Sequence, residues 1–589
     1  MEDITVETQR LDHLGIVAGI CHEIGLIEII DERIGKTDRK VSVGIAVQAM
    51  VLNALGFVGR PLYLTPEYFE NKPLDRLLRP GITAEDLNDD SLGRALDALF
   101  EAGLTELFAK IASHALDVFG IEYRFAHLDT TSFSVVGAYP EKENPPPEKT
   151  NNLSGVENPL LEVTSTQGES NEPSAVRITY GYSKDHRPDL KQVMLEMICA
   201  HRSSLPLWLK ALDGNSSDTT SFPKAVNAYV EQLKGAPEPY FVYDSAGYSA
   251  ANVAILASRK WITRVPERIG EAADLCREYP IEAMRASALP GYRYAEVMSY
   301  YGGIPQRWLV VYSEAAYQRE GETLRRRIEA ERRQAEKAAE RLPEAPDVET
   351  ARAQVAAMEA RWRSHRWEGE IEEVGHYDKP GRPRSDQAPD RVTYQAVGSV
   401  VPDAERVEAQ RATLGRFVLA TDELDDEALP AEAILSTYKG QGASVERGFR
   451  FLKDPLFFAG SLFLKSAKRI MALLMVMGLS LLIYALAEHR LREELKRREE
   501  TVPDAKGKPT QRPTMRRIFQ MFEGIDVLKG HARIPERGSA MPRGERESGG
   551  DEPRTRAGCG ERVLNLTPLH LRILDYFGPH VKKCYIDTY

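Results

Sequence analysis

The feature that most constrains this 589-residue chain is an uncharged apolar run, IMALLMVMGLSLLIYALA, from Ile470 to Ala487. Its 18 residues are at the lower limit of what crosses a bilayer as a helix. A helix that is buried on all sides in a large soluble protein has the same pattern. Polar sequence with candidate functional residues leads directly into the run, and no second run of this kind follows. We therefore predict a buried core helix and no membrane partner, with a membrane-anchored protein as the alternative.

The overall composition is that of a globular protein with several domains, because 42% of the residues are apolar and 28% are charged. The cysteines are far apart and form no CxxC pair, which excludes a disulfide scaffold and the common zinc modules. They are Cys21, Cys199, Cys276, Cys559 and Cys584. The chain opens on polar sequence, MEDITVETQR, so we expect a reducing, cytoplasmic location.

The net charge of −11 hides a gradient along the chain. Between Arg447 and Arg562 there are 24 Lys and Arg against 15 Asp and Glu, which is +9, so the remainder carries −20. A basic tract on an acidic protein predicts a surface that binds a polyanion. The alternative is that these charges are only solvated helix faces.

Changes in composition and hydrophobic pattern divide the chain into five regions. An α/β core is predicted where apolar strand-like segments alternate with helical ones, as in KWITRVP (260–266) after SAANVAILASR. The hairpin of two charged helices at 314–365 belongs to an insertion. The predicted regions are a helical region that binds DNA or only packs (1–121), the first part of the core (122–268), an insertion subdomain (269–430), the rest of the core (431–500), and a basic arm with a terminal helix (501–589).

Two aspartates stand out by their position relative to predicted strands. Asp129 ends the apolar segment in AHLDTTS, where we predict a strand, a polar turn and a second strand. Asp244 ends the apolar segment in FVYDSAG. Both carboxylates are therefore expected at the C-terminal edge of a strand, where open α/β sheets commonly place their sites. A single aspartate after a strand is usually a turn former, but two with the same pattern are informative.

A third acidic residue lies on a predicted helix from Val445 to Leu456, in VERGFRFLKDP. Its apolar face comprises Val445, Phe449, Leu452 and Leu456. Glu446, Arg450 and Lys453 form a polar stripe beside that face. The stripe is either part of a site or only an ion pair between Glu446 and Arg450, four residues apart.

Taken together, these segments resemble the DDE transposases of bacterial and archaeal insertion sequences. The resemblance is to the group with a Tyr-Arg-Glu-Lys signature around the catalytic glutamate, because Glu446 and Lys453 are separated by six residues. Supporting segments are HLDTTSFSVVG, YGYSKDHRPDLKQ, DGNSSD, VYDSAGYS, ITRVPE, GRFVLATDEL and STYKGQGASVERGFRFLKDP. The resemblance implies a ribonuclease-H-like mixed α/β sheet with flanking helices, an inserted subdomain before the glutamate helix, and an N-terminal helical domain.

The signature is displaced in its first half. Family members place the tyrosine seven residues and the arginine four residues before the glutamate, where this chain has Lys439 and Gly442. Tyr438 lies one residue further out. The resemblance implies that the residues around the glutamate contact DNA, and in this chain those residues are Lys453, Arg450, Arg447, Lys439 and Tyr438.

The chemistry of the acidic residues agrees with the resemblance. Three converging carboxylates repel one another unless hard cations neutralise them, and oxygen ligands suit Mg²⁺ or Mn²⁺. The resemblance implies two such ions, with Asp129 bridging both and with Asp244 and Glu446 holding one each, for in-line phosphoryl transfer.

The resulting expectation is an insertion-sequence transposase that acts on double-stranded DNA. It would bind terminal inverted repeats, cut at the element ends, and join the 3′-hydroxyls to target DNA, as a homodimer in the nucleoid. Two alternatives remain: a ribonuclease-H-like DNA nuclease without strand transfer, and an inactive DNA-binding protein derived from a transposase.

Overall fold

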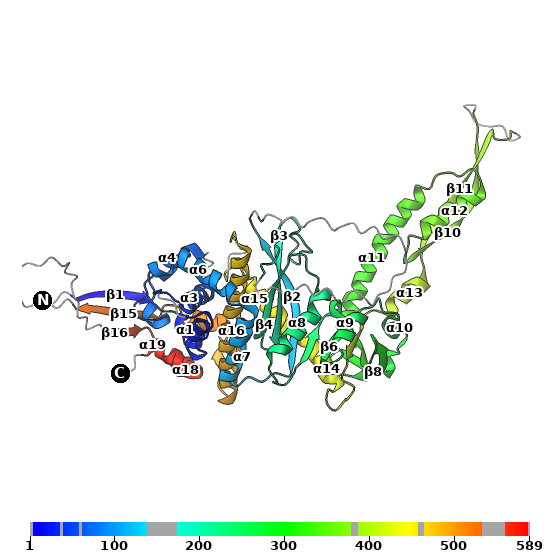
Figure 1. Cartoon of the computed structure of the whole chain (residues 1–589). Coiled ribbons are helices and arrows are strands. Elements are labelled where there is room, and N and C mark those ends of the chain that lie inside the picture. Colours follow the sequence, from blue (N-terminus) through cyan, green and yellow to red (C-terminus); the bar gives the residue numbers. More distant parts are fainter. Residues whose placement is uncertain are drawn as a thin grey trace, which may run out of the picture. The chain divides into compact units, whose positions relative to one another are not determined.

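The protein is described by a computed structural model that covers residues 4–35, 39–57, 62–137, 139, 174–378, 387–457, 464–532 and 560–586 (Figure 1). It divides into two compact units, described separately below. The first unit comprises Met1–Val242 and Lys439–Tyr589, and the second comprises Tyr243–Tyr438. Most of the basic arm predicted at 534–560 lies outside the described residues.

The N-terminal part of the first unit is helical, as the sequence predicts. Side chains cap the starts of two of these helices, because Ser42 accepts a hydrogen bond from the Ile45 amide and Asn88 accepts one from the Ser91 amide. The helices are α1 (Leu14–Glu23), α2 (Leu26–Ile34), α3 (Val43–Leu55), α4 (Thr65–Phe69), α5 (Leu74–Leu77), α6 (Asp89–Glu101) and α7 (Leu104–Phe119).

The apolar run lies in α16 (Ala467–Arg497), which passes through the interior of the first unit. This helix has the length and hydropathy of a membrane span, but 94% of its most apolar 18-residue window is buried inside the protein. It packs against α1, α3, α6, α7, α18 (Pro568–Phe577) and β4 (Pro206–Leu212). The predicted buried helix is confirmed.

The sheet of the first unit has the strand order β4-β3-β2-β5. β2 (Phe125–Val135) and β3 (Lys191–Ala200) are antiparallel, as are β3 and β4, whereas β5 (Tyr240–Tyr243) runs parallel to β2. The helix α8 (Asp218–Gln232) contacts β2. The chain therefore contains the mixed sheet with flanking helices that the sequence predicts.

The predicted turn after Asp129 is wrong. β2 is one continuous strand, and Asp129, Thr130 and Thr131 pair in register with Met197, Glu196 and Leu195 of β3. The two threonines are β-branched and therefore favour an extended backbone. Asp129 thus lies in the middle of a strand and not at its C-terminal edge.

The second unit contains an antiparallel strand series and helices. The strand order is β6 (Trp261–Val265), β12 (Arg416–Thr421), β9 (Ile304–Ser313), β8 (Tyr292–Tyr301) and β7 (Arg285–Ala286). The accompanying helices are α9 (Ala250–Ile255), α10 (Gly270–Glu278), α13 (Ala404–Ala412) and α14 (Ala431–Lys439), whose last residue belongs to the first unit.

The predicted charged hairpin is confirmed within the second unit. α11 (Glu314–Glu340) and α12 (Val348–Glu359) are joined to an antiparallel ribbon of β10 (His365–His376) and β11 (Arg391–Pro402), which Figure 1 shows beside them. Ala335, Met358 and Trp362 form a small apolar cluster where these elements meet. On the surface of α11, Arg332 and Arg333 pair with glutamates three or four residues away.

The C-terminal residues fold back onto the N-terminus of the first unit. β1 (Ile4–Arg10) pairs antiparallel with β15 (Asp526–Ala532), which pairs with β16 (Gly560–Leu564). The remaining elements are the short strands β13 (Val502–Pro503) and β14 (Pro509–Thr510) and the helices α17 (Met515–Met521) and α19 (Pro579–Tyr585), of which α19 packs on α1.

Candidate active site

Asp129 is held in the first unit by its own strand and by a lysine. Its side chain is 19% exposed, and one carboxylate oxygen, Oδ1, accepts a hydrogen bond from the Thr130 amide at 2.7 Å. The Lys184 ammonium lies 3.6 Å from the same oxygen. The carboxylate is therefore reachable from solvent and lies beside a positive charge.

Lys184 also connects Asp129 to a second aspartate. Its ammonium donates to the carbonyl oxygen of Thr130 at 2.7 Å and to the Thr130 hydroxyl at 2.9 Å, and it lies 3.3 Å from Asp218 Oδ2. The Thr130 hydroxyl donates in turn to Asp218. The sequence pattern indicates no role for Lys184 or Asp218, although both lie in segments that support the family resemblance, YGYSKDHRPDLKQ and DGNSSD.

Glu446 lies in the first turn of α15 (Val445–Leu452) and is exposed to solvent. The buried side chains of Val445, Phe449 and Leu452 turn the opposite face of the helix toward the protein, where α15 contacts β2, β3 and α16. A Cβ atom on Gly448 would lie 3.1 Å from both Met197 Cε of β3 and Leu481 Cδ2 of α16. The close approach at this glycine places the Glu446 helix directly on the sheet that carries Asp129.

The predicted extent of this helix is wrong at its C-terminal end. α15 ends at Leu452, and the side chain of Leu456 is 51% exposed instead of lying on the apolar face. Pro455 explains the difference, because proline disfavours a helical conformation in the residue before it and cannot donate a backbone hydrogen bond.

The cations predicted to contact DNA around Glu446 have protein partners. Lys453 pairs with Asp185 at 2.6 Å, and Arg450 donates to the carbonyl oxygen of Gly442 at 3.2 Å. The alternative in which Arg450 pairs with Glu446 is not observed, since within the described residues the Glu446 carboxylate makes no ion pair.

Arg447 is part of a buried ion-pair network. Its guanidinium lies 2.5 Å from the carboxylate of Glu488 on α16, and Arg492 lies 2.7 Å from the same carboxylate. The Glu488 side chain is only 4% exposed. This network ties α15 to α16, which is a structural role that the sequence did not indicate.

Tyr438 and Lys439 end α14, ahead of the glutamate helix. Tyr438 is the last residue of the second unit, and its ring centroid lies 6.3 Å from that of Phe417 in the same unit. Lys439 is the residue at which the chain re-enters the first unit. Their predicted DNA contacts stay predictions.

Asp244 directly follows the end of β5, as predicted. Its carboxylate caps the short turn after the strand by accepting from the Ala246 amide at 2.9 Å, and its carbonyl oxygen accepts from the Thr263 hydroxyl of β6 at 3.0 Å. Asp129 and Glu446 thus belong to the first unit and Asp244 to the second. In the described part of the chain, no three His, Cys, Asp or Glu side chains gather closely enough to hold a metal ion.

A buried glutamate of β3, Glu196, is paired with Thr130 of β2. Glu196 is 1% exposed, and burial raises the pKa of its carboxyl group to about 7, with the charge of Asp218 adding to the shift. The folded protein therefore keeps a proton on Glu196 at pH values where the unfolded chain has lost it.

We expect the free energy of unfolding to decrease as the pH rises from about 4.5 to 7, because the native state binds the extra proton in that range. The decrease attributable to Glu196 is about 3 kcal/mol. Glu196→Gln should remove it and be more stable than the wild type at pH 8, whereas Glu231→Gln, at an exposed position, should change nothing. Urea unfolding between pH 5 and 8 in the presence of EDTA measures this, and equal pH slopes for wild type and Glu196→Gln would contradict the assignment.

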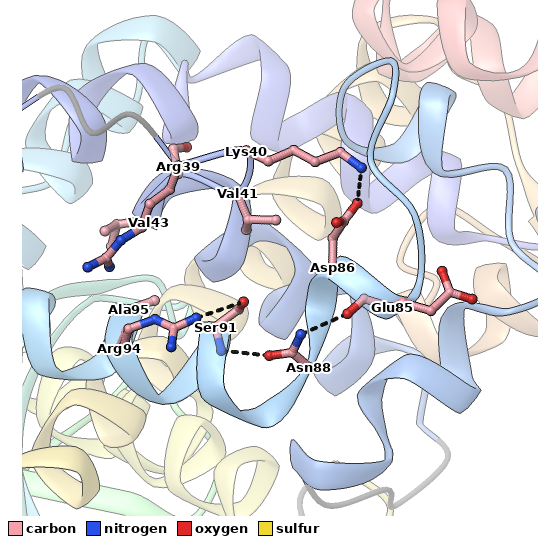
Figure 2. A pocket seen from close by; sticks show the side chains of 11 residues that line it. Arg39, Lys40, Val41, Val43, Glu85, Asp86, Asn88, Ser91, Arg94 and Ala95 are labelled. Carbon is pink, nitrogen blue, oxygen red and sulfur yellow. Dashed lines mark hydrogen bonds and ion pairs between the residues drawn. The ribbon is translucent and has the colours of Figure 1, made fainter. Parts of the chain in front are cut away.

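A pocket of about 320 Å³ lies away from these carboxylates, at the N-terminal ends of α3 and α6 (Figure 2). Arg39 and Arg94 line it, and Lys40 pairs across it with Asp86 at 2.5 Å. Its lining mixes acidic and basic side chains and includes none of Asp129, Asp244 and Glu446, so the pocket is not part of the candidate site.

One family model matches the N-terminal part of the chain. Residues 6–113 match the model of a domain of unknown function, DUF4277. No curated protein matches the chain. Among solved structures, a piggyBac transposase in a synaptic complex with hairpin DNA is similar over 88% of this chain and 82% of its own, at 10% identity and a TM-score of 0.34, which is too distant to establish a shared fold. The segment that matches a family model therefore ends before Asp129.

Proposed function

We propose that this protein is a DNA transposase of the DDE type, in which Asp129, Asp244 and Glu446 form one metal-binding site. The observation that carries the proposal is the packing of α15, which bears Glu446, on β2, which bears Asp129. This packing holds the short helix with the exposed Glu446 carboxylate against the strand that carries the partly exposed Asp129 carboxylate.

The pairing of β2 with β5 supports the inclusion of Asp244. The two strands run parallel with His127 opposite Val242, and each aspartate follows its paired residue by two positions. The two strands therefore run toward their aspartates in the same direction, with Asp129 inside β2 and Asp244 just after the end of β5. The mixed order of the strands likewise supports a ribonuclease-H-like core.

The donor set fits hard divalent cations, because all three proposed ligands are carboxylates. Mg²⁺ or Mn²⁺ ions bound there would supply activation of the attacking oxygen and stabilisation of the leaving oxygen in a phosphoryl transfer. Asp129, Asp244 and Glu446 would hold the ions. Lys184, which lies beside Asp129, would orient that carboxylate.

The substrate that we propose is double-stranded DNA, with terminal inverted repeats as the sites of cutting and a second duplex as the target. Lys453, Arg450 and Lys439 are proposed to hold the cut end. For Lys453, this requires exchanging its ion pair with Asp185 for a phosphate. A homodimer would pair the two ends of the element, in the cytoplasm of a bacterial or archaeal cell.

The test is metal-dependent cutting of a duplex that carries the DNA flanking the gene. Asp129→Asn and Glu446→Gln should each reduce the cutting rate by ~10²–10³-fold, since each weakens the binding of a metal ion that would stabilise charge in the transition state. DNA affinity should be retained or increased. The control is Glu336→Gln, a carboxylate on α11 that is paired with Arg332.

Cutting at the wild-type rate by Asp129→Asn would refute the carboxylate site. A pre-cut end with a free 3′-hydroxyl distinguishes the transposase from a nuclease, because only a transposase joins that end to a second duplex. DNA binding without cutting in Mg²⁺ or Mn²⁺ would instead identify an inactive DNA-binding protein.

A further inference from the structure

A second polar cavity in the first unit is larger than the pocket at the N-terminal ends of α3 and α6, and more of its charged side chains are basic than acidic. It has a volume of about 620 Å³ and lies where the start of β2, the β3–β4 turn, the later turns of α16 and the residues after β14 meet. We call it the basic cleft and define it by its five cations, Arg124, Arg202, Arg492, Lys496 and Arg512.

The acidic side chains of the basic cleft do not neutralise these cations. Glu488, Glu122 and Glu493 also line it, but Glu488 is already shared between Arg492 and Arg447. Two histidines at the cleft are neutral near pH 7, because burial lowers the pKa of His201 to about 4 and burial also lowers the pKa of His489.

Three of the cations are exposed and point to an external anion. Within the part of the chain that the structure describes, Arg202, Lys496 and Arg512 make no ion pair or side-chain hydrogen bond. Unpaired like charges held close together repel one another. This repulsion is visible at Arg492, whose pKa is lowered by burial and by the positive charges of Arg447 and Arg512.

The position of the basic cleft relates it to the candidate carboxylate site. Phe125, the first residue of β2, lines the cleft, and Asp129 lies four residues further along the same strand. At about 3.3 Å per residue this is roughly 13 Å, or about four base pairs of duplex along its axis. The wall residue Glu488 also holds Arg447, the neighbour of Glu446.

We infer that the basic cleft binds the sugar–phosphate backbone of duplex DNA, about four base pairs from the position of the candidate carboxylate site. This inference rests on the proposed function for the identity of the polyanion. Cations that come from four separate segments suit a row of phosphates, and arginine forms charge-assisted pairs with phosphate oxygens. Such contacts fix the register of the duplex without reading its sequence.

The experiment measures the affinity of a fluorescent 30-base-pair duplex by anisotropy at several salt concentrations in EDTA, so that no cutting occurs. The triple variant Arg202→Ala, Lys496→Ala, Arg512→Ala should bind at least ~10-fold more weakly, and the slope of log K against log salt should become shallower by about 3. The matched control replaces Arg325, Arg327 and Lys337, which are exposed cations on α11.

An unchanged salt slope in the cleft variant, with unchanged thermal stability, would overturn the inference. Equal losses of DNA affinity in the cleft and control variants would also overturn it. The same holds if 10 mM inorganic phosphate competes as strongly as unlabelled duplex, or if an RNA duplex of the same sequence binds more tightly than the DNA. Because binding is measured without metal, failure of the carboxylate variants to affect cutting would refute the proposed function and leave this result intact.

Discussion

Leu479→Arg is expected to leave the protein insoluble or unfolded. Leu479 is completely buried in α16, and the neighbouring Gly478 is so tightly packed that a Cβ atom there would lie 2.2 Å from Leu209 Cδ2 of β4. An arginine at position 479 has no carboxylate partner and no path to water. An unpaired buried charge costs several kcal/mol, which is a large share of the stability of a typical domain.

The matched control for this substitution is Leu456→Arg, at a leucine whose side chain is 51% exposed. It should fold and remain soluble, because surface substitutions usually change stability by no more than about 0.5 kcal/mol. The measurements are the soluble fraction after expression and the thermal unfolding curve. A soluble, cooperatively folding Leu479→Arg protein would contradict the buried position of α16, and recovery of the wild-type protein only with membranes would favour the membrane-anchored alternative.

Glu488→Gln is expected to lower the free energy of unfolding by about 3–5 kcal/mol. The carboxylate is 4% exposed and is shared by Arg447 of α15 and Arg492 of α16, whose side chains are 31% and 23% exposed, so its removal leaves two partly buried guanidinium groups without this counter-charge. Removing one partner from a buried ion pair has a cost of this size. Because Arg447 is adjacent to Glu446, we also expect DNA cutting to be reduced.

Glu494→Gln provides the comparison for Glu488→Gln, because Glu494 also pairs with two arginines, Arg497 and Arg498, but its side chain is 25% exposed. Its loss should cost about 1 kcal/mol or less. Chemical denaturation of both variants at pH 7 measures the difference. Equal and small losses would mean that the Glu488 network does not hold α15 on α16.

Features that depend on residues close together in the chain could be predicted from the amino-acid pattern. An uncharged run as long as Ile470–Ala487 has to avoid water, so its composition predicts removal from water, and the polar sequence before it favours burial in the protein over a membrane. The periodicity of Val445, Phe449 and Leu452 likewise placed Glu446 on the solvent side of a helix, because 3.6 residues complete one turn. The strand that ends just before Asp244 was recognisable from its apolar residues.

Features that depend on partners far apart in the chain could not be predicted in this way. The sequence predicts that a strand ends at Asp129, and pairing with β3, more than 60 residues later, continues that strand through Asp129 to Val135. Lys184, Asp218 and Glu488 acquire their roles from neighbours brought close by the sheet and by α16. The pairing of β1 with β15 joins residues over 500 positions apart. Local patterns carry no information about such contacts, because their stability comes from surfaces that meet only when the chain has folded.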